Sequence, residues 1–201
     1  MFIIIEGIDG AGHTTQSDLL KEYFKGLGVD FIFLKTPNKS LPIGGAYYSY
    51  LNKEYELNTE SVFSLCASDV IMNKERILEA KKNNKVILFE RYITSTLAYQ
   101  AANGFNFEKG IKIIKLLGFP KADIIIYLDL PVDVAIERKM KNKILDRHES
   151  DRGLLERVKD MYEKQIKMNF LGKWYRIDAT KDIETVHQDI IKIIKNKLKT
   201  K

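Results

Sequence analysis

The sequence predicts an α/β domain in which helices cover both faces of a parallel β-sheet. Two observations carry this prediction: short apolar runs of strand length alternate with longer segments of helical periodicity, and no internal repeat or break in composition divides the 201 residues. Strands that are separated by helices pair in parallel through crossover connections, which place helices on both faces. One domain is the simplest organisation for a chain of this length.

Five runs are expected to form the strands of this sheet. Each has strand length and is rich in β-branched, aromatic or other apolar residues. In chain order the runs are Phe2–Glu6, Asp30–Thr36, Lys85–Glu90, Asp123–Asp129 and Lys173–Asp178. The second run stops at Pro37, which has no N–H to donate to a strand ladder.

Helical periodicity fills most of the sequence between these runs. In the first helix Leu20, Phe24 and Leu27 recur at helical spacing, and Gly28 follows as a candidate C-terminal cap. The expected helices cover 14–27, 44–52, 59–83, 92–118 with a break near Asn103-Gly104, Pro131 to about 141, about 152–170 and 182–198. A charged loop over about 142–152 separates two of them.

The composition narrows the classes of function. The 33 basic and 27 acidic residues give a net charge of +6, which suits a polyanionic ligand such as a nucleotide. Lysines in the last ten residues supply most of this excess and fit the solvated end of a terminal helix, so no nucleic-acid partner is expected. Cys66 is the one cysteine, and no apolar run approaches the ~18 residues of a membrane span. We therefore expect a cytoplasmic protein with no membrane partner.

The first strand runs into a glycine-rich loop that precedes a helix. Gly7 and Gly12 have the spacing of G-x-x-x-x-G-K-[ST], and Thr14 stands at the hydroxyl position that ligates Mg²⁺. Glycines let successive N–H groups point at a phosphate, and the helix N-terminus adds a positive dipole end. The residues expected to bind ATP here are Gly7, Ile8, Asp9, Gly10, Ala11, Gly12, His13, Thr14 and Thr15.

His13 stands where this loop pattern has a lysine. Histidine is shorter than lysine and has a reference pKa of about 6.5. Because a bound phosphate favours the protonated ring, we expect His13 to substitute in part for the lysine. The alternatives are a weakened catalyst and a loop that only looks like a phosphate loop.

Six sequence blocks in order along the whole chain resemble those of thymidylate kinases. They are 2–16 (FIIIEGIDGAGHTTQ), Pro37-Asn38-Lys39-Ser40 with Ile43-Gly44, Glu90-Arg91-Tyr92 with Ser95, Ala98, Tyr99 and Gln100, Asp129-Leu130-Pro131, Asp146-Arg147-His148-Glu149, and Ile177-Asp178-Ala179-Thr180. The resemblance implies a P-loop nucleoside-monophosphate kinase fold with a five-stranded parallel sheet and a mobile lid over about 142–152. It also implies the conversion of ATP and dTMP to ADP and dTDP in dTTP biosynthesis, with Mg²⁺, usually in a homodimer.

The resemblance assigns roles around the transferred phosphate, where Arg91, Glu90, His13 and Arg147 are the expected catalytic residues. Arg91 follows the third strand, where open α/β sheets bind ligands, and it is expected to clamp the monophosphate; the alternative is a surface salt bridge. Glu90 stands where the family usually has Asp and is expected to orient Mg²⁺ water together with Thr14. A Glu-Arg pair also resembles deoxynucleoside kinases, in which the Glu is a base toward a sugar hydroxyl.

The resemblance also implies roles for charged residues that lie outside the third strand. Asp9 is expected to accept a hydrogen bond from the sugar 3′-hydroxyl, or else to stabilise a turn. Lys39 is a candidate contact of the monophosphate, or an exposed loop lysine. Gly10 stands where one branch of the family has an Arg, and the other branch uses a lid arginine. Arg147 is therefore expected to bring positive charge to the γ-phosphate, the alternative being a solvated charged loop.

The residues expected around the acceptor nucleoside and around the adenine of ATP are assigned less specifically. Tyr99 and Gln100 are expected to line the nucleoside pocket, although residues at this helical spacing are as often plain core. Asp178, Ala179 and Thr180 are expected to border adenine, mainly through the backbone.

The chain departs from the family where thymine is read. Family members carry an aromatic residue and an Arg in a block like F-x-A-x-R, whereas this chain reads Leu65-Cys66-Ala67-Ser68-Asp69-Val70. Asp69 is the candidate base contact, but a carboxylate accepts hydrogen bonds and cannot donate to a carbonyl as Arg does. Whole-chain similarity favours dTMP. A kinase of another pyrimidine nucleotide or of a deoxynucleoside, or a weakly active nucleotide-binding homologue, remains the alternative.

Overall fold

A computed structural model describes residues 1–140, 147–148 and 151–199. Its strands form one sheet in the order β2-β3-β1-β4-β5, and every neighbouring pair is parallel. The strands are β1 (Phe2–Gly7), β2 (Phe31–Lys35), β3 (Val86–Glu90), β4 (Ile124–Asp129) and β5 (Trp174–Asp178). The predicted five-stranded parallel sheet is confirmed.

The helices agree with the periodicity except at one place. They are α1 (His13–Gly26), α2 (Pro42–Leu51), α3 (Thr59–Ile71), α4 (Lys74–Lys82), α5 (Ile93–Ala102), α6 (Phe107–Leu117), α7 (Val132–Met140), α8 (Arg152–Lys167) and α9 (Ile183–Lys199). The prediction of one helix over 59–83 is wrong, since α3 ends before Asn73. The Asn73 side chain donates to the carbonyl of Asp69 and its backbone N–H to Val70, which satisfies carbonyls at the helix end.

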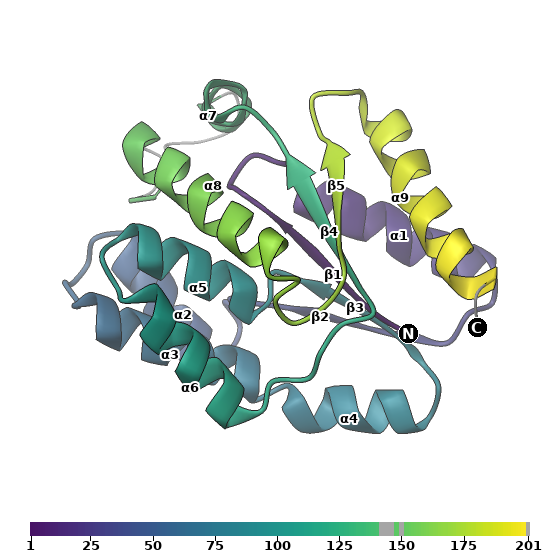
Figure 1. Ribbon diagram of the computed structural model, residues 1–201, viewed down its shortest axis with the longest axis horizontal. Coiled ribbons are helices and arrows are strands. Elements are labelled where there is room, and N and C mark those ends of the chain that lie inside the picture. Colours follow the sequence, from purple (N-terminus) through teal and green to yellow (C-terminus); the bar gives the residue numbers. More distant parts are fainter. Residues whose placement is uncertain (141–146, 149–150, 200–201) are drawn as a thin grey trace.

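The sheet lies between two layers of helices (Figure 1). Helices α1 and α9 cover one face, and α5 and α8 cover the other, with α3 and α6 against α5 and α2 farther out against α3. The central strands β1 and β4 are buried along nearly their whole length, as a parallel sheet covered on both faces requires. In the described ranges no helix combines the length and the apolar character needed to cross a membrane.

The strand register gathers polar residues at the carboxyl edge of the sheet. Ile5 pairs with Glu90 across β1 and β3, and Lys35 pairs with Glu90 across β2 and β3. The loop after β1 begins at the same edge with Gly7. Ligands bind in open α/β sheets outside this edge, where neighbouring connections diverge to opposite faces.

Candidate active site

A cavity of about 190 Å³ opens at the carboxyl edge of the sheet. Its wall combines the loop after β1, the ends of β2 and β3, and faces of α2, α3, α5 and α7. The polar side chains that line it include Asp9, His13, Thr14, Lys35, Asp69, Glu90, Arg91, Tyr99, Gln100, Lys139 and His148. Eight residues that the sequence singled out for phosphate and acceptor binding therefore meet in one place: Asp9, His13, Thr14, Asp69, Glu90, Arg91, Tyr99 and Gln100.

The phosphate loop depends on glycine at two positions. Gly12 caps the N-terminus of α1 with a φ of 98°, in the left-handed region that side chains disfavour. Gly10 has a φ of 88°, and a Cβ there would lie 2.5 Å from the carbonyl oxygen of Ala135 in α7. The loop thus curls tightly, with the first turn of α1 directed at the ligand side and α7 close behind it.

His13 is buried at the start of α1, with its ring turned toward the backbone of the phosphate loop. Its Nε2 lies 3.1 Å from the carbonyl oxygen of Ile8, which can only accept, so Nε2 carries a proton. Burial and then the positive charge of Arg91 lower the pKa of His13 to about 3. The ring is therefore neutral at neutral pH in this structure, and partial substitution for the lysine when a phosphate binds stays a prediction.

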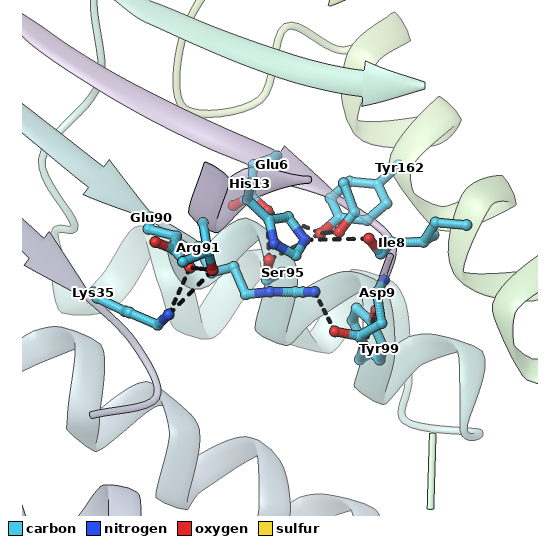
Figure 2. Close-up of polar contacts among 12 residues, drawn as sticks. Glu6, Ile8, Asp9, His13, Lys35, Glu90, Arg91, Ser95, Tyr99 and Tyr162 are labelled. Atoms are coloured by element: carbon cyan, nitrogen blue, oxygen red, sulfur yellow. Dashed lines mark hydrogen bonds and ion pairs between the residues drawn. The ribbon is translucent and has the colours of Figure 1, made fainter. Parts of the chain in front are cut away.

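Arg91 and Asp9 form an ion pair across the cavity (Figure 2). The Nη2 of Arg91 lies 2.6 Å from Oδ1 of Asp9, and Tyr99 donates its hydroxyl to Oδ2 at 2.6 Å. The same hydroxyl accepts from the Asp9 N–H at 3.0 Å. Burial alone would raise the pKa of Asp9, but nearby positive charge, that of Arg91 above all, and the Tyr99 hydrogen bond together outweigh it and lower the pKa. Asp9 is thus an anion that orients Arg91.

The backbone of Arg91 is held in an uncommon conformation. Its φ is 60°, a left-handed value that is rare for a residue with a side chain. Its N–H donates to the carbonyl of Ile5, and its carbonyl accepts from the Thr36 hydroxyl at 2.6 Å. Such a conformation persists where the surroundings over-determine it, which is typical of functional positions.

Glu6, next to this strand end, is a fully buried carboxylate with several donors. It accepts from the backbone N–H of Tyr92 at 3.0 Å, from the Tyr162 hydroxyl at 2.8 Å, and from the hydroxyls of Thr94 and Ser95. These bonds tie the start of α5 and the side chain from α8 to β1. Glu6 therefore positions the segment that carries Arg91 and Tyr99.

Thr14 and Glu90, the residues predicted to hold Mg²⁺, are hydrogen-bonded to each other. The Thr14 hydroxyl donates to Oε1 of Glu90 at 2.6 Å, and Lys35 places its Nζ 2.7 Å from the same oxygen. Hydroxyl and carboxylate oxygens are the donors that Mg²⁺ prefers, and Mg²⁺ is commonly held by one or two protein oxygens together with substrate phosphates. The donor set fits Mg²⁺ bound with ATP. Among the residues that the structure describes, no cluster of three His, Cys, Asp or Glu offers an all-protein metal site.

The far end of the cavity presents buried polar atoms without partners. Gln100 is 1% exposed, and neither its Nε2 nor its Oε1 has a hydrogen bond. Asp69 accepts from the N–H of Asn38 at 3.0 Å through Oδ2, while its Oδ1 is unpartnered, and burial raises the pKa of its carboxyl. Cys66 beside them is half-buried, and burial raises the pKa of its thiol, so it is no nucleophile.

Two predicted phosphate contacts do not line the cavity. Lys39 is exposed, with its Nζ 5.6 Å from the centre of the Tyr48 ring. Arg147 makes a double hydrogen bond to Glu56, at 2.7 and 2.8 Å, and lies over the Tyr50 ring. The rest of the predicted lid falls largely outside the described residues, which include only 147–148 and 151–152 of it.

The loop after β5 is separate from this cavity. The Asp178 carboxylate accepts from the Thr180 N–H and hydroxyl at 3.0 and 2.6 Å, and Ala179 donates its N–H to the carbonyl of Asp129. Asp178 and Thr180 line a second pocket with Lys159, Arg176 and Lys181. The residues predicted to border adenine therefore form a turn that is stabilised by its own hydrogen bonds and lies next to a charged surface pocket.

Sequence reasoning missed Glu6, Lys35 and Lys139 as residues of the site. Lys35 ends an apolar strand, which is a signal that could have found it, because strand ends meet at the ligand edge of a parallel sheet. Glu6 lies inside the first sequence block, but only the fold shows that α5 and α8 cover it. Lys139 lies in a run of charged residues close to the predicted lid and belongs to no motif, and α7 brings it to the cavity wall.

Comparison with known proteins decides the family. The thymidylate kinase family model matches residues 5–190. The chain belongs to the thymidylate kinase family. It is 32% identical to the thymidylate kinase of Fervidobacterium nodosum, over 96% of this chain and 98% of that protein. It is 30% identical to the thymidylate kinase of Plasmodium falciparum, over 95% of this chain and 88% of that protein.

A solved thymidylate kinase structure has the same fold. The enzyme from Candida albicans, described as revealing the origin of broad substrate specificity, superposes with a TM-score of 0.79. It covers 97% of this chain and 91% of its own, at 24% sequence identity. The predicted nucleoside-monophosphate kinase fold is thus confirmed, and the thymidylate kinase family is confirmed by the sequence comparisons.

Proposed function

We propose that this protein transfers the γ-phosphoryl group of ATP to dTMP and thereby produces ADP and dTDP for dTTP biosynthesis. The observation that carries the proposal is that the phosphate loop and Arg91 face one cavity, in a chain of the thymidylate kinase family. A phosphate oxygen of dTMP forms a bond to the γ-phosphorus while the bond to the β–γ bridging oxygen breaks, and the electron pair leaves with ADP. Such a reaction needs positioning and charge stabilisation rather than covalent help from the protein.

Arg91 is the best-placed group for the transferred phosphoryl group. Its guanidinium can hold two phosphate oxygens at once, and Asp9 and Tyr99 fix its direction before substrate binds. In this arrangement Asp9 is a positioning residue, and its proposed contact with the sugar 3′-hydroxyl would add to that role. The loop amides and the N-terminus of α1 bind the phosphates of ATP.

Mg²⁺ would be held by the hydroxyl of Thr14 and by the carboxylate of Glu90, directly or through water, where it would neutralise charge on the phosphates of ATP. Glu90 is bonded to Thr14 and Lys35 on the loop side of the cavity. These contacts favour a role of Glu90 toward the nucleotide phosphates over a role as a base toward a sugar hydroxyl.

The acceptor base would sit against Gln100 and Asp69. Gln100 offers a donor and an acceptor side by side, which complements the N3–H and a carbonyl of thymine. Asp69 offers only an acceptor when ionised. Contacts of Lys39 with the monophosphate, of Arg147 with the γ-phosphate and of Asp178–Thr180 with adenine remain predictions, as do the mobile lid, the homodimer and the cytoplasmic location.

An ADP-release assay with Mg-ATP and a panel of acceptors tests this function. The panel is dTMP, dUMP, UMP, dCMP, dGMP and thymidine. We expect turnover with dTMP to exceed that with the others. Turnover with thymidine alone would instead support a deoxynucleoside kinase, and ATP binding without turnover of any acceptor would support a nucleotide-binding homologue.

A further inference from the structure

The phosphate loop lacks the cation that its sequence pattern carries. His13 stands at the lysine position, and its Nε2–H donates a hydrogen bond to the carbonyl of Ile8. With this side of the ring turned to the backbone, the loop offers the terminal phosphates of ATP no lysine ammonium group, although phosphoryl transfer is catalysed mainly by charge stabilisation.

Lys35 brings an ammonium group to the same place from another strand. It is the last residue of β2 and pairs in register with Glu90 of β3. Its Nζ lies 2.7 Å from Oε1 of Glu90 and 3.3 Å from the hydroxyl oxygen of Thr14, the residue that follows His13 in the first turn of α1. Figure 2 shows Lys35 approaching Glu90 on the side opposite to the Arg91–Asp9 pair.

The exposure of this pair differs from that of an ordinary surface ion pair. The Glu90 side chain is 2% exposed whereas that of Lys35 is 38% exposed, so the carboxylate is enclosed and the ammonium group still faces the open cavity. Lys85 and Asp30 form a comparable pair at the other end of the same two strands, at 3.1 Å. There the lysine is 36% exposed, but the carboxylate is 72% exposed and no phosphate loop lies beside it.

We propose that Lys35 supplies the cation of the phosphate loop, and that its ammonium group binds the terminal phosphates of ATP in place of a lysine at position 13. The inference rests on the proposed function for the identity of this ligand. In the structure the ammonium group contacts Glu90 and Thr14, the two residues whose oxygens fit Mg²⁺. Binding of ATP would move the ammonium group from these oxygens to the phosphates. Lysine suits such a movement because its flexible four-carbon stem carries a compact charge.

The test compares four variants with the wild type: Lys35→Met, Lys35→Arg, the double variant His13→Lys/Lys35→Met, and Lys85→Met as the matched control. Lys85→Met removes a lysine of similar exposure from an ion pair on the same strands. Three quantities are measured. They are the Kd of a fluorescent ATP analogue in EDTA without metal or turnover, kcat with the KM values for ATP and dTMP, and the Tm of each variant.

We expect Lys35→Met to weaken metal-free binding of the ATP analogue about 10-fold and to lower kcat on the order of 100-fold. The KM for dTMP should stay within about twofold, because Lys35 does not hold the acceptor. Lys35→Arg should retain more activity than Lys35→Met. The His13→Lys change should restore kcat in the double variant by about 10-fold or more, and Lys85→Met should stay within about twofold of wild type.

The rescue separates a charge role from a structural role, because lysine at position 13 does not rebuild the contacts with Glu90 and Thr14. A folded Lys35→Met variant with wild-type ATP binding and kcat would overturn the inference. So would a loss that His13→Lys leaves unchanged. If Lys35→Met does not fold, Lys35→Gln carries the same comparison, since its amide can still donate to Glu90. Wild-type protein that binds ATP through Lys35 but does not phosphorylate dTMP would overturn the proposed function and leave this inference standing.

Discussion

The guanidinium group of Arg91 lies 2.6 Å from the Asp9 carboxylate and so joins the end of β3 to the phosphate loop after β1. Both side chains are largely shielded from water, at 12% and 22% exposure. A charged pair in such surroundings is strongly directional, because neither group finds equivalent partners in solvent. The pair therefore sets the direction in which Arg91 meets a substrate phosphate.

Removal of the guanidinium group should abolish most of the catalytic power. We expect Arg91→Ala to lower kcat/KM for dTMP on the order of 10²–10³-fold, because a preorganised cation at the transferred phosphoryl group is lost. Steady-state kinetics of Arg91→Ala and of Arg76→Ala measure this. Arg76 is an exposed arginine of α4 that bonds to Asn73, so its variant should stay near wild type. A near-normal rate for Arg91→Ala would remove Arg91 from the site.

Asp9→Asn should change how stability responds to acid. The pKa of Asp9 is lowered below its ordinary value of 3.8, so its ion pair with Arg91 stabilises the folded state fully above about pH 5 and less as pH falls through the lowered folded pKa. The free-energy difference of unfolding between wild type and Asp9→Asn should thus be constant at neutral pH and shrink below about pH 4. Urea unfolding at several pH values measures it. A difference that grows in acid would contradict the ion-pair assignment.

His13 should destabilise the protein in mild acid. Its pKa is about 3 in the folded protein against 6.5 for the free side chain, so the unfolded chain binds a proton that the folded protein does not. Stability should therefore fall as pH drops from about 6.5 toward 3, by about 1.4 kcal/mol per pH unit at most. His13→Asn, whose amide can still donate to Ile8, should lack this slope.

Urea unfolding of wild type and His13→Asn between pH 4 and 8 isolates the effect of His13, since the other two histidines are present in both proteins. Equal slopes for the two proteins would show that His13 has the same pKa in the folded and the unfolded states, which would contradict the lowered pKa. The neutral ring also predicts that activity between pH 6 and 8 carries no titration from His13, which the pH profile of kcat checks.

Gln100 should determine recognition of the acceptor base. Both polar atoms of its buried side chain lack partners, so a base that pairs with them restores two hydrogen bonds. We expect Gln100→Leu, which keeps the shape, to raise the KM for dTMP by about 10-fold or more while the KM for ATP stays unchanged. Gln16→Leu is a control on α1, because Gln16 is also buried but bonds to Ile183 and does not line the cavity. Equal effects on both KM values would place Gln100 in the protein scaffold instead.

Much of the fold could be predicted because its signals are local. The strands are short apolar runs that need two buried faces, and the loop from Gly7 to Gly12 has a spacing that only a tight phosphate-binding turn requires. The break near Asn103-Gly104 was predicted correctly, whereas the break at Asn73 was not. At Asn73 no glycine or proline marks the end of α3, and a side-chain hydrogen bond to Asp69 ends the helix instead.

The sequence by itself determined the parallel α/β fold, the phosphate loop and the family, since each depends on residues close together in the chain or on blocks in a set order. The tertiary structure alone decided which charges the site contains. Lys35 meets Glu90 only because β2 lies beside β3, and the pKa of His13 is lowered because packing buries its ring close to the charge of Arg91. The charge at a site depends on partners and burial, and both are set by packing between segments that are distant in the sequence.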